Sequence, residues 1–159
     1  MLTSEIGDAI EIESISFRNS PASPDPAGNY DDLEIYIGLC DSDVLGATYA
    51  DNFITGTRTL VLSSTLYSTG TVGVGEWFDI ELDTPYWYNG ADNLLIEVIW
   101  PSGSGSLYPY AWDSGSDRSS FGTYSSTSGA FQSRLPHMRL NGTLELSNTT
   151  FGEIKATFL

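Results

Sequence analysis

The chain has 159 residues, with 21 acidic and six basic side chains and a formal net charge of -15. A chain of this length can form one domain that buries roughly 70% of its unfolded surface. The negative charge argues against nucleic acids, whose phosphates need clustered Lys and Arg, and against anionic membrane surfaces. The single cysteine, Cys40, excludes an intramolecular disulfide and a cysteine-based metal site, and we expect it to be a small buried hydrophobe.

The first third of the chain predicts two strands separated by a loop. Residues 10–17 alternate apolar and polar side chains but change phase, which predicts a β-bulge near Glu13. Residues 19–28 contain three prolines, which fix φ and remove backbone donors, so we expect an exposed loop there. Residues 33–39 alternate strictly and predict a strand with one core-facing side.

Residues 41–53 are the one stretch for which we predict a helix. Ser42 or Asp43 could cap it, and its apolar side would be formed by Val44, Leu45, Tyr49 and Phe53. Gly46 weakens helical structure, so we limit the prediction to one or two turns.

The middle of the chain predicts the strand around which the fold is built. Residues 59–63 and 77–82 are expected strands, and Asn89-Gly90 is a strong turn signal. Residues 94–100 place apolar side chains on both faces, which is typical of a central strand covered on both sides. We therefore assign Trp100 to the core.

The last third alternates short strands with polar loops. Residues 107–112 predict a short strand, and residues 113–130 are a long Ser/Gly-rich stretch. Residues 136–140 resume β structure, and Asn141-Gly142 predicts a turn after them. Residues 151–159 offer a further alternating segment, with one apolar face formed by Ile154, Ala156 and Phe158.

Together these elements predict an all-β protein, an antiparallel β-sandwich of jelly-roll type with about eight to ten short strands. At most one short helix is expected, near residues 42–53. We expect residues 1–147 to form the sandwich module. Residues 148–159 would be a C-terminal strand or tail, which could belong to the same sandwich. The longest apolar run is far shorter than the ~20 residues needed to span a membrane as a helix, so we expect no membrane partner.

Several segments together resemble a known module. The chain begins with Thr3-Ser4-Glu5-Ile6-Gly7, and the similarity continues through residues 12–17, 33–38, 48–53, 84–97 and 135–140. This pattern resembles an accessory β-sandwich of large secreted and cell-surface bacterial proteins, similar in shape to carbohydrate-binding modules. The resemblance implies a non-catalytic domain beside other domains of a larger secreted protein. It carries no ligand residues with it.

The chain departs from this resemblance at its start. In such modules a further strand precedes the Ser-Glu-Ile-Gly segment, whereas this chain has almost nothing before Thr3. We expect either that this strand was trimmed or that something else takes its place. Residues 149–155 resemble a short tail found at the ends of some secreted bacterial proteins.

Aromatic residues are the strongest candidates for a binding site. Sugar rings present C–H faces that stack on exposed aromatic side chains, and neighbouring polar groups bind the hydroxyls. The candidates cluster in the second half of the chain: Tyr86, Trp87, Tyr108, Tyr110 and Trp112, with Asp113 and Arg118 as polar partners of Trp112. The alternative is that these aromatics fill the core and cover its ends, because aromatic residues dominate core burial.

Calcium is the cofactor that the acidic loops favour. Asp41 and Asp43 lie two residues apart, and Asp113 and Asp117 lie four apart. Ca²⁺ takes six to eight oxygen ligands, which loops rich in carboxylates can supply. Its role would be structural, because the chain has no disulfide to tie its loops together.

No catalytic residues are predicted. His137 is the only histidine, which makes a Ser-His-Asp triad and a histidine-rich metal site poor hypotheses. We therefore expect a non-enzymatic, secreted or cell-surface module that binds a polysaccharide or a cell-surface glycan. One alternative is an assembly subunit that self-associates by terminal strand exchange. The other is a polysaccharide-acting enzyme, for which two facing carboxylates would be required.

Overall fold

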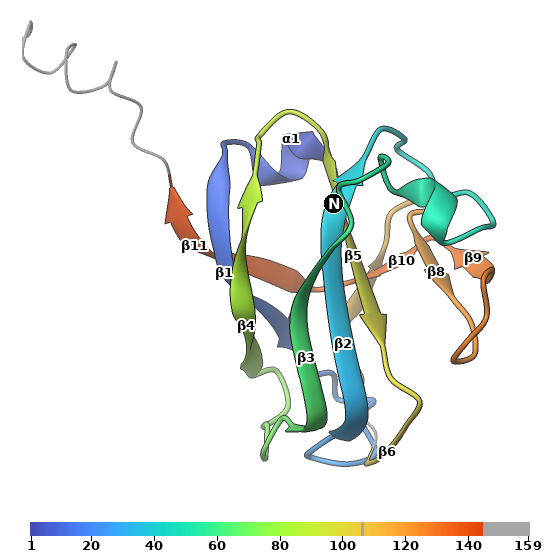
Figure 1. Cartoon of the computed structure of the whole chain (residues 1–159). Helices are drawn as coiled ribbons and strands as arrows, with labels where there is room; N and C mark the ends of the chain where they lie inside the picture. The colour runs from blue at the N-terminus through green and yellow to red at the C-terminus, as the bar shows by residue number, and fades with distance from the viewer. Residues whose placement is uncertain (106, 145–159) are drawn as a thin grey trace, which may run out of the picture.

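Strands dominate the secondary structure of the described residues, which confirms the predicted all-β fold class (Figure 1). The computed structural model describes residues 1–105 and 107–144. Six longer strands build the body: β1 (Ile10–Arg18), β2 (Asn29–Cys40), β3 (Thr59–Ser68), β4 (Trp77–Tyr88), β5 (Asn93–Ile99) and β11 (Met138–Leu144). Five strands have three residues each: β6 (Ser102–Ser104), β7 (Ala111–Asp113), β8 (Ser119–Phe121), β9 (Ala130–Gln132) and β10 (Arg134–Pro136).

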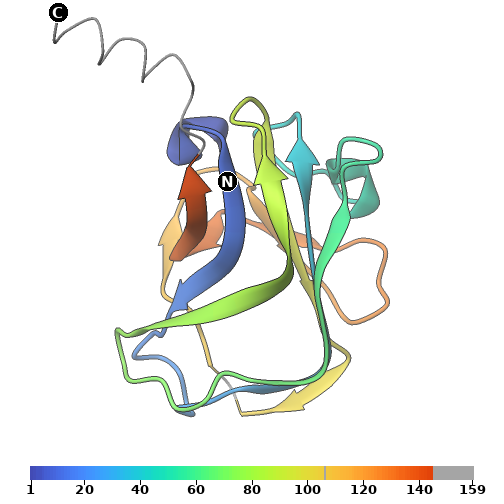
Figure 2. The ribbon, with the colours of Figure 1, turned by 60° about the vertical axis from the view of Figure 1, so that its left-hand side comes forward.

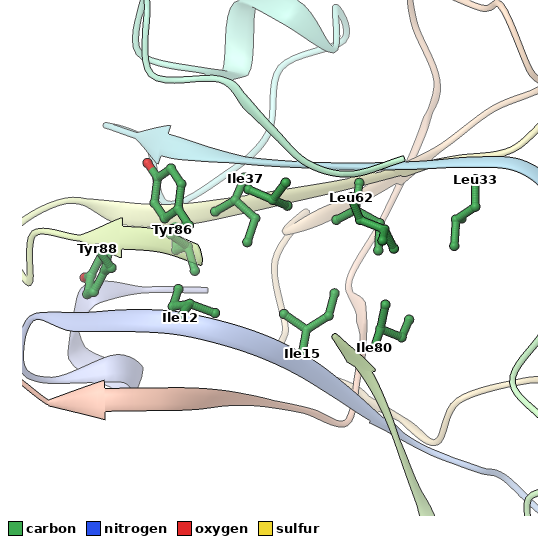
Figure 3. Close-up of a cluster of buried hydrophobic side chains, with 11 residues drawn as sticks. Ile12, Ile15, Leu33, Ile37, Leu62, Ile80, Tyr86 and Tyr88 are labelled. Carbon is green, nitrogen blue, oxygen red and sulfur yellow. The ribbon is translucent and has the colours of Figure 1, made fainter. Parts of the chain in front are cut away.

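The long strands form two antiparallel sheets that face one another. One sheet has the order β11-β1-β4, and the other has the order β3-β2-β5 with β6 also paired to β2. Side chains from both sheets meet between them and form the core (Figure 3). The core consists of Ile12, Ile15, Leu33, Ile35, Ile37, Val61, Leu62, Ile80, Tyr86, Tyr88 and Leu94. This arrangement is the predicted sandwich.

The predicted bulge near Glu13 is confirmed. The register of β1 shifts between Ile12 and Ser14 against both of its neighbours, β4 and β11. Because side chains in a strand alternate between faces, one extra residue is needed to turn both Ile12 and Ile15 inward. Both are fully buried, so the bulge gives β1 a continuous apolar face.

The helical segments differ in part from the prediction. Inside the predicted range 42–53 there is a single 3₁₀ turn at Ala50–Asn52, and a short α-helix at Thr3–Ile6 was not predicted. Asn52 organises the first of these segments, because its side-chain amide donates to the carbonyls of Gly46 and Thr48. These hydrogen bonds hold residues 46–52 in a compact loop. A longer helix would have needed an apolar periodicity that Gly46 interrupts.

Three further sequence interpretations are wrong. The central strand of its sheet is β2, whereas β5 is hydrogen-bonded to β2 alone among the described strands. Trp100, assigned to the core, is 46% exposed and makes an edge-to-face contact with Tyr30. Asn141-Gly142 makes no turn: both residues lie inside β11, where Gly142 pairs with Ile12. The Asn89-Gly90 turn, in contrast, is confirmed and joins β4 to β5.

Gly142 is required by the close approach of β1. A Cβ atom at this position would collide with the carbonyl oxygen of Glu11. We therefore expect Gly142→Ala to lower the free energy of unfolding by about 1–3 kcal/mol, as overpacking does. Urea denaturation measures the effect. The neighbouring exposed substitution Thr143→Ala is the control, with an expected change within about 0.5 kcal/mol. Equal stabilities of the two variants would contradict this account of the glycine.

Candidate functional site

The sandwich is closed along one side and hollow along the other. On the closed side the chain passes from β3 to β4, and hydrogen bonds from Ser63 N to Asp83 Oδ2 (2.9 Å) and from Tyr67 Oη to Asp79 O (3.2 Å) join them. On the other side, residues 107–136 leave the sheets and form two small ribbons (Figures 1 and 2). In one ribbon β7 pairs with β10, and in the other β8 pairs with β9. We call residues 107–136 the arm. A hollow of about 1400 Å³ lies between the arm and β5.

The outward face of β2 and β5 forms one wall of the hollow. Leu33, Ile35 and Ile37 point into the core, so the alternation of β2 turns Glu34 and Tyr36 outward. Tyr36 lies opposite Glu97 in the β2–β5 ladder. The side chains of Glu34, Tyr36 and Glu97 therefore lie on one face of the sheet. The register between β2 and β5 determines which of them are neighbours in this wall.

Arg58 joins the polar groups of this wall. Its guanidinium lies 3.4 Å from the centre of the Tyr36 ring and donates to Glu97 Oε2 at 2.7 Å. The Tyr36 hydroxyl donates to Glu34 Oε2 at 2.9 Å. Burial, followed by the hydrogen bond to the Glu34 carboxylate, raises the pKa of Tyr36. The result is a stacked, charged and hydrogen-bonded cluster, which we call the Arg58 cluster: Glu34, Tyr36, Arg58 and Glu97.

The arm supplies the facing wall with exposed aromatic rings. Phe121 is 58% and Tyr124 57% exposed, and both line the hollow together with Trp100 and Trp112. Two hydroxyl groups at this wall, those of Tyr49 and Ser120, are buried without a hydrogen-bond partner among the described residues. Both hydroxyl oxygens are closed to solvent, so they are not counted among the groups that a ligand in the hollow would meet.

A salt bridge fixes the arm to the start of the chain. Arg118 donates to both carboxylate oxygens of Glu5, at 3.0 and 2.5 Å, and the Arg118 side chain is 9% exposed. The same guanidinium lies 5.9 Å from the centre of the Trp112 ring. Leu45 N also donates to Asp117 O, and Tyr49 N donates to Thr127 O, which ties the arm to the loop before the 3₁₀ turn at Ala50–Asn52. These contacts position the aromatic wall.

The predicted binding residues do not share one surface. Trp112 and Arg118 line the hollow, as expected of a candidate platform. Tyr86 is 9% exposed and belongs to the core, so its prediction as a ligand residue is corrected: its position in β4 turns it inward. Trp87, the next residue of β4, is 50% exposed but does not line the hollow.

The other three predicted binding residues, Tyr110, Tyr108 and Asp113, make contacts outside the hollow. Tyr110 stacks with Arg18 at 4.9 Å and with His137 at 5.7 Å, so His137 is a packed histidine. Tyr108 is exposed, and its backbone N–H binds Ser23 Oγ outside the hollow. Asp113 accepts from Gly115 N at 2.9 Å and closes a turn; hydrogen bonds, chiefly that to Ser133, lower its pKa.

The predicted calcium ligands are not gathered into a site. Within residues 1–105 and 107–144, no three His, Cys, Asp or Glu side chains lie close enough together to hold a metal ion. Asp41 and Asp117 are exposed, and Asp43 accepts from the side chain of Asn93 at 2.9 Å. Calcium stays a prediction from the sequence, and nothing below depends on it.

Sequence reasoning missed the Arg58 cluster. The alternation of residues 33–39 turns Glu34 and Tyr36 outward, and Glu97 is a polar residue within an apolar strand, but no local pattern joins them. Arg58 lies outside β3, at the residue before it, so its position over Tyr36 depends on the β2–β3 register. A charged residue that interrupts an otherwise apolar strand was the one available signal.

Comparison with protein-family models, with curated proteins and with solved structures gave no match for this chain. The resemblance to accessory modules therefore stays a prediction from the sequence. The short helices of the described residues include none that is long and apolar enough to cross a membrane.

The Glu5–Arg118 pair predicts that the arm loosens at acidic pH. The hydrogen bond from Arg118 holds the pKa of the Glu5 carboxyl below its usual value. The pair therefore stabilises the folded chain above an unfolded-state pKa of about 4.3, and this contribution is lost as the pH falls through the lower folded pKa. Because Glu5 is 32% exposed, we expect well under about 1 kcal/mol.

Amide exchange of residues 119–121, measured by NMR between pH 6 and pH 3, tests this prediction after correction for intrinsic rates. Exchange should accelerate as Glu5 is protonated. Glu5→Gln, which keeps the shape and removes the titration, should exchange fast throughout and show no step. An identical pH profile in both proteins would show that the pair does not hold the arm.

Proposed function

We propose that this chain is a non-catalytic, extracellular accessory module that binds a neutral polysaccharide in the hollow between β5 and the arm. The observation that carries the proposal is the Arg58 cluster facing exposed aromatic rings across one large hollow. Secretion follows from the resemblance of the sequence and belongs to the same proposal.

The chemistry of the hollow suits a sugar chain. Aromatic rings such as Tyr124 and Trp112 offer flat apolar faces for the C–H groups of a pyranose. Carboxylates and a guanidinium beside them offer acceptors and donors for hydroxyls.

Charge narrows the class of polysaccharide. The chain carries a net charge of -15, and the Arg58 cluster holds two carboxylates and one guanidinium. A uronate or sulfated polymer would be repelled at long range. A neutral polymer meets no such barrier, and its hydroxyls can bind carboxylates and Arg58 alike.

The two carboxylates of the cluster support binding rather than catalysis in this proposal. Glu97 accepts from Arg58, and Glu34 accepts from Tyr36. A glycosidase needs one carboxyl poised as an acid and a second poised as a base or nucleophile across the substrate. Both carboxylates here lie on one sheet face, so we assign them to hydroxyl recognition.

Affinity electrophoresis in gels containing neutral polysaccharides tests the proposal. A panel of glucans, mannans, xylans and galactans should include at least one polymer that retards the protein. Tyr124→Ala, which removes an exposed ring and leaves the core intact, should weaken binding to that polymer by about tenfold, or roughly 1.4 kcal/mol. Trp87→Ala removes a similarly exposed ring outside the hollow and should leave the mobility unchanged. No retardation by any polymer, or equal losses in both variants, would refute the site.

A further inference from the structure

Strand β5 has the sequence of a central strand and the position of an edge strand. Its apolar side chains lie on both faces, yet among the described strands it is hydrogen-bonded to β2 alone. Edge strands are normally short, charged or covered, because an open edge exposes unpaired backbone groups to any extended chain. The apolar edge of β5 therefore points to a missing neighbour.

A ladder begins on this free edge and stops after one residue. The Met1 ammonium donates to Leu94 O at 2.6 Å, and Leu94 N donates to Met1 O at 2.9 Å. The N–H and C=O of Leu94 thus point away from β2. Since backbone groups alternate along a strand, those of Ile96 and Val98 also point to the free edge. They offer two further donors and two further acceptors to an added strand.

The space beside this edge is apolar and continuous with the core. Phe17, Ile96, Val98, Leu135 and Met138 line the hollow at this level, and Phe17, Ile96 and Val98 also pack against the core. A strand laid along β5 would place alternate side chains between the two sheets and the others on the face that carries Glu97. It would have to be apolar on one side and polar on the other.

We propose that residues 151–159 of the same chain add to β5 as this strand and close the sandwich. The segment alternates as the groove requires: Ile154, Ala156 and Phe158 form an apolar face, and Glu153, Lys155 and Thr157 form a polar one. Its length, from 151 to 159, is enough to cover β5 (Asn93–Ile99). Lys155 is the one lysine of the chain and would share a sheet face with Glu34 and Glu97.

The tether allows the segment to reach its own β5. Leu144, where β11 ends, and Met1, which is bonded to Leu94, line the same small hollow of about 320 Å³. The six residues 145–150 can span up to about 20 Å when extended. A short tether raises the effective concentration of the segment to the millimolar range, which favours its own chain over a second copy. Entering near Leu94, the segment would run parallel to β5.

Hydrogen exchange, read residue by residue by NMR, tests the proposal on the full chain and on a chain ending at Leu144. In the full chain the amides of Ile96 and Val98 should exchange at least tenfold more slowly than in the truncated chain. The amides of Leu95 and Glu97 point to β2 and should be protected in both, which makes them the internal control. Equally fast exchange of Ile96 and Val98 in both chains would refute strand addition.

A matched pair of substitutions separates the two faces of the segment. Ile154→Asp places a charge on the groove side and should abolish the protection of Ile96 and Val98. Thr157→Asp places the same charge on the outer side and should leave most of the protection. Retained protection of Leu95 and Glu97 in both variants shows that the β2–β5 pairing is intact. Equal effects of the two substitutions would contradict the predicted alternation.

Light scattering over a range of concentrations tests the intramolecular arrangement. We expect a monomer whose exchange protection does not depend on concentration. A dimer that is lost in the truncated chain would refute closure by the same chain and assign the segment to a second copy. The added strand would occupy the part of the hollow beside Ile96 and Val98, so the inference does not rest on polysaccharide binding in the rest of that hollow. Tyr124→Ala should leave the protection of Ile96 and Val98 unchanged, so the two proposals can fail separately.

Discussion

The satisfaction of backbone hydrogen bonds is the constraint on which this structure depends. Strand β2 is paired along both edges, since β3 flanks one edge and β5 and β6 flank the other. Strand β5 is paired along one edge, with Met1 extending the other edge by a single residue. Because a buried N–H or C=O without a partner is costly, this half-paired strand marks where the fold can accept a further chain.

Strand β5 takes part in both proposals, the polysaccharide site and the addition of a strand. Its outward residue Glu97 belongs to the Arg58 cluster, and its inward residues Ile96 and Val98 line the apolar groove. The arm covers this side of the sandwich because Arg118 binds Glu5 and because loop backbone groups pair across to residues 45 and 49. One face of β5 thus carries the polar residue Glu97 toward the proposed sugar site. The other face carries the apolar residues Ile96 and Val98 toward the groove, because side chains alternate along a strand.

Much of the fold could be read from local patterns. The strict alternation of residues 33–39 and the phase change near Glu13 depend on neighbouring residues only, and both are found in β2 and in the β1 bulge. The hollow could not be read in this way. Arg58 reaches Tyr36 through the β2–β3 register, and Arg118 reaches Glu5 across 113 positions of sequence. Aromatic content predicted a binding surface, but burial divided its members: Tyr86 lies in the core and Trp112 in the hollow.

The sequence by itself determined that this chain is a β-sandwich, because period-two hydrophobicity sets which face of each strand is buried. It also determined the turn at Asn89-Gly90, since these residues tolerate the positive φ that such a turn requires. Only the tertiary structure decided the neighbours of each strand. An apolar strand has the same sequence pattern whether one strand or two are hydrogen-bonded to it. The pairing depends on segments that are distant in sequence, so the local pattern does not contain it. The position of β5 at the edge, and the hollow beside it, follow from that pairing.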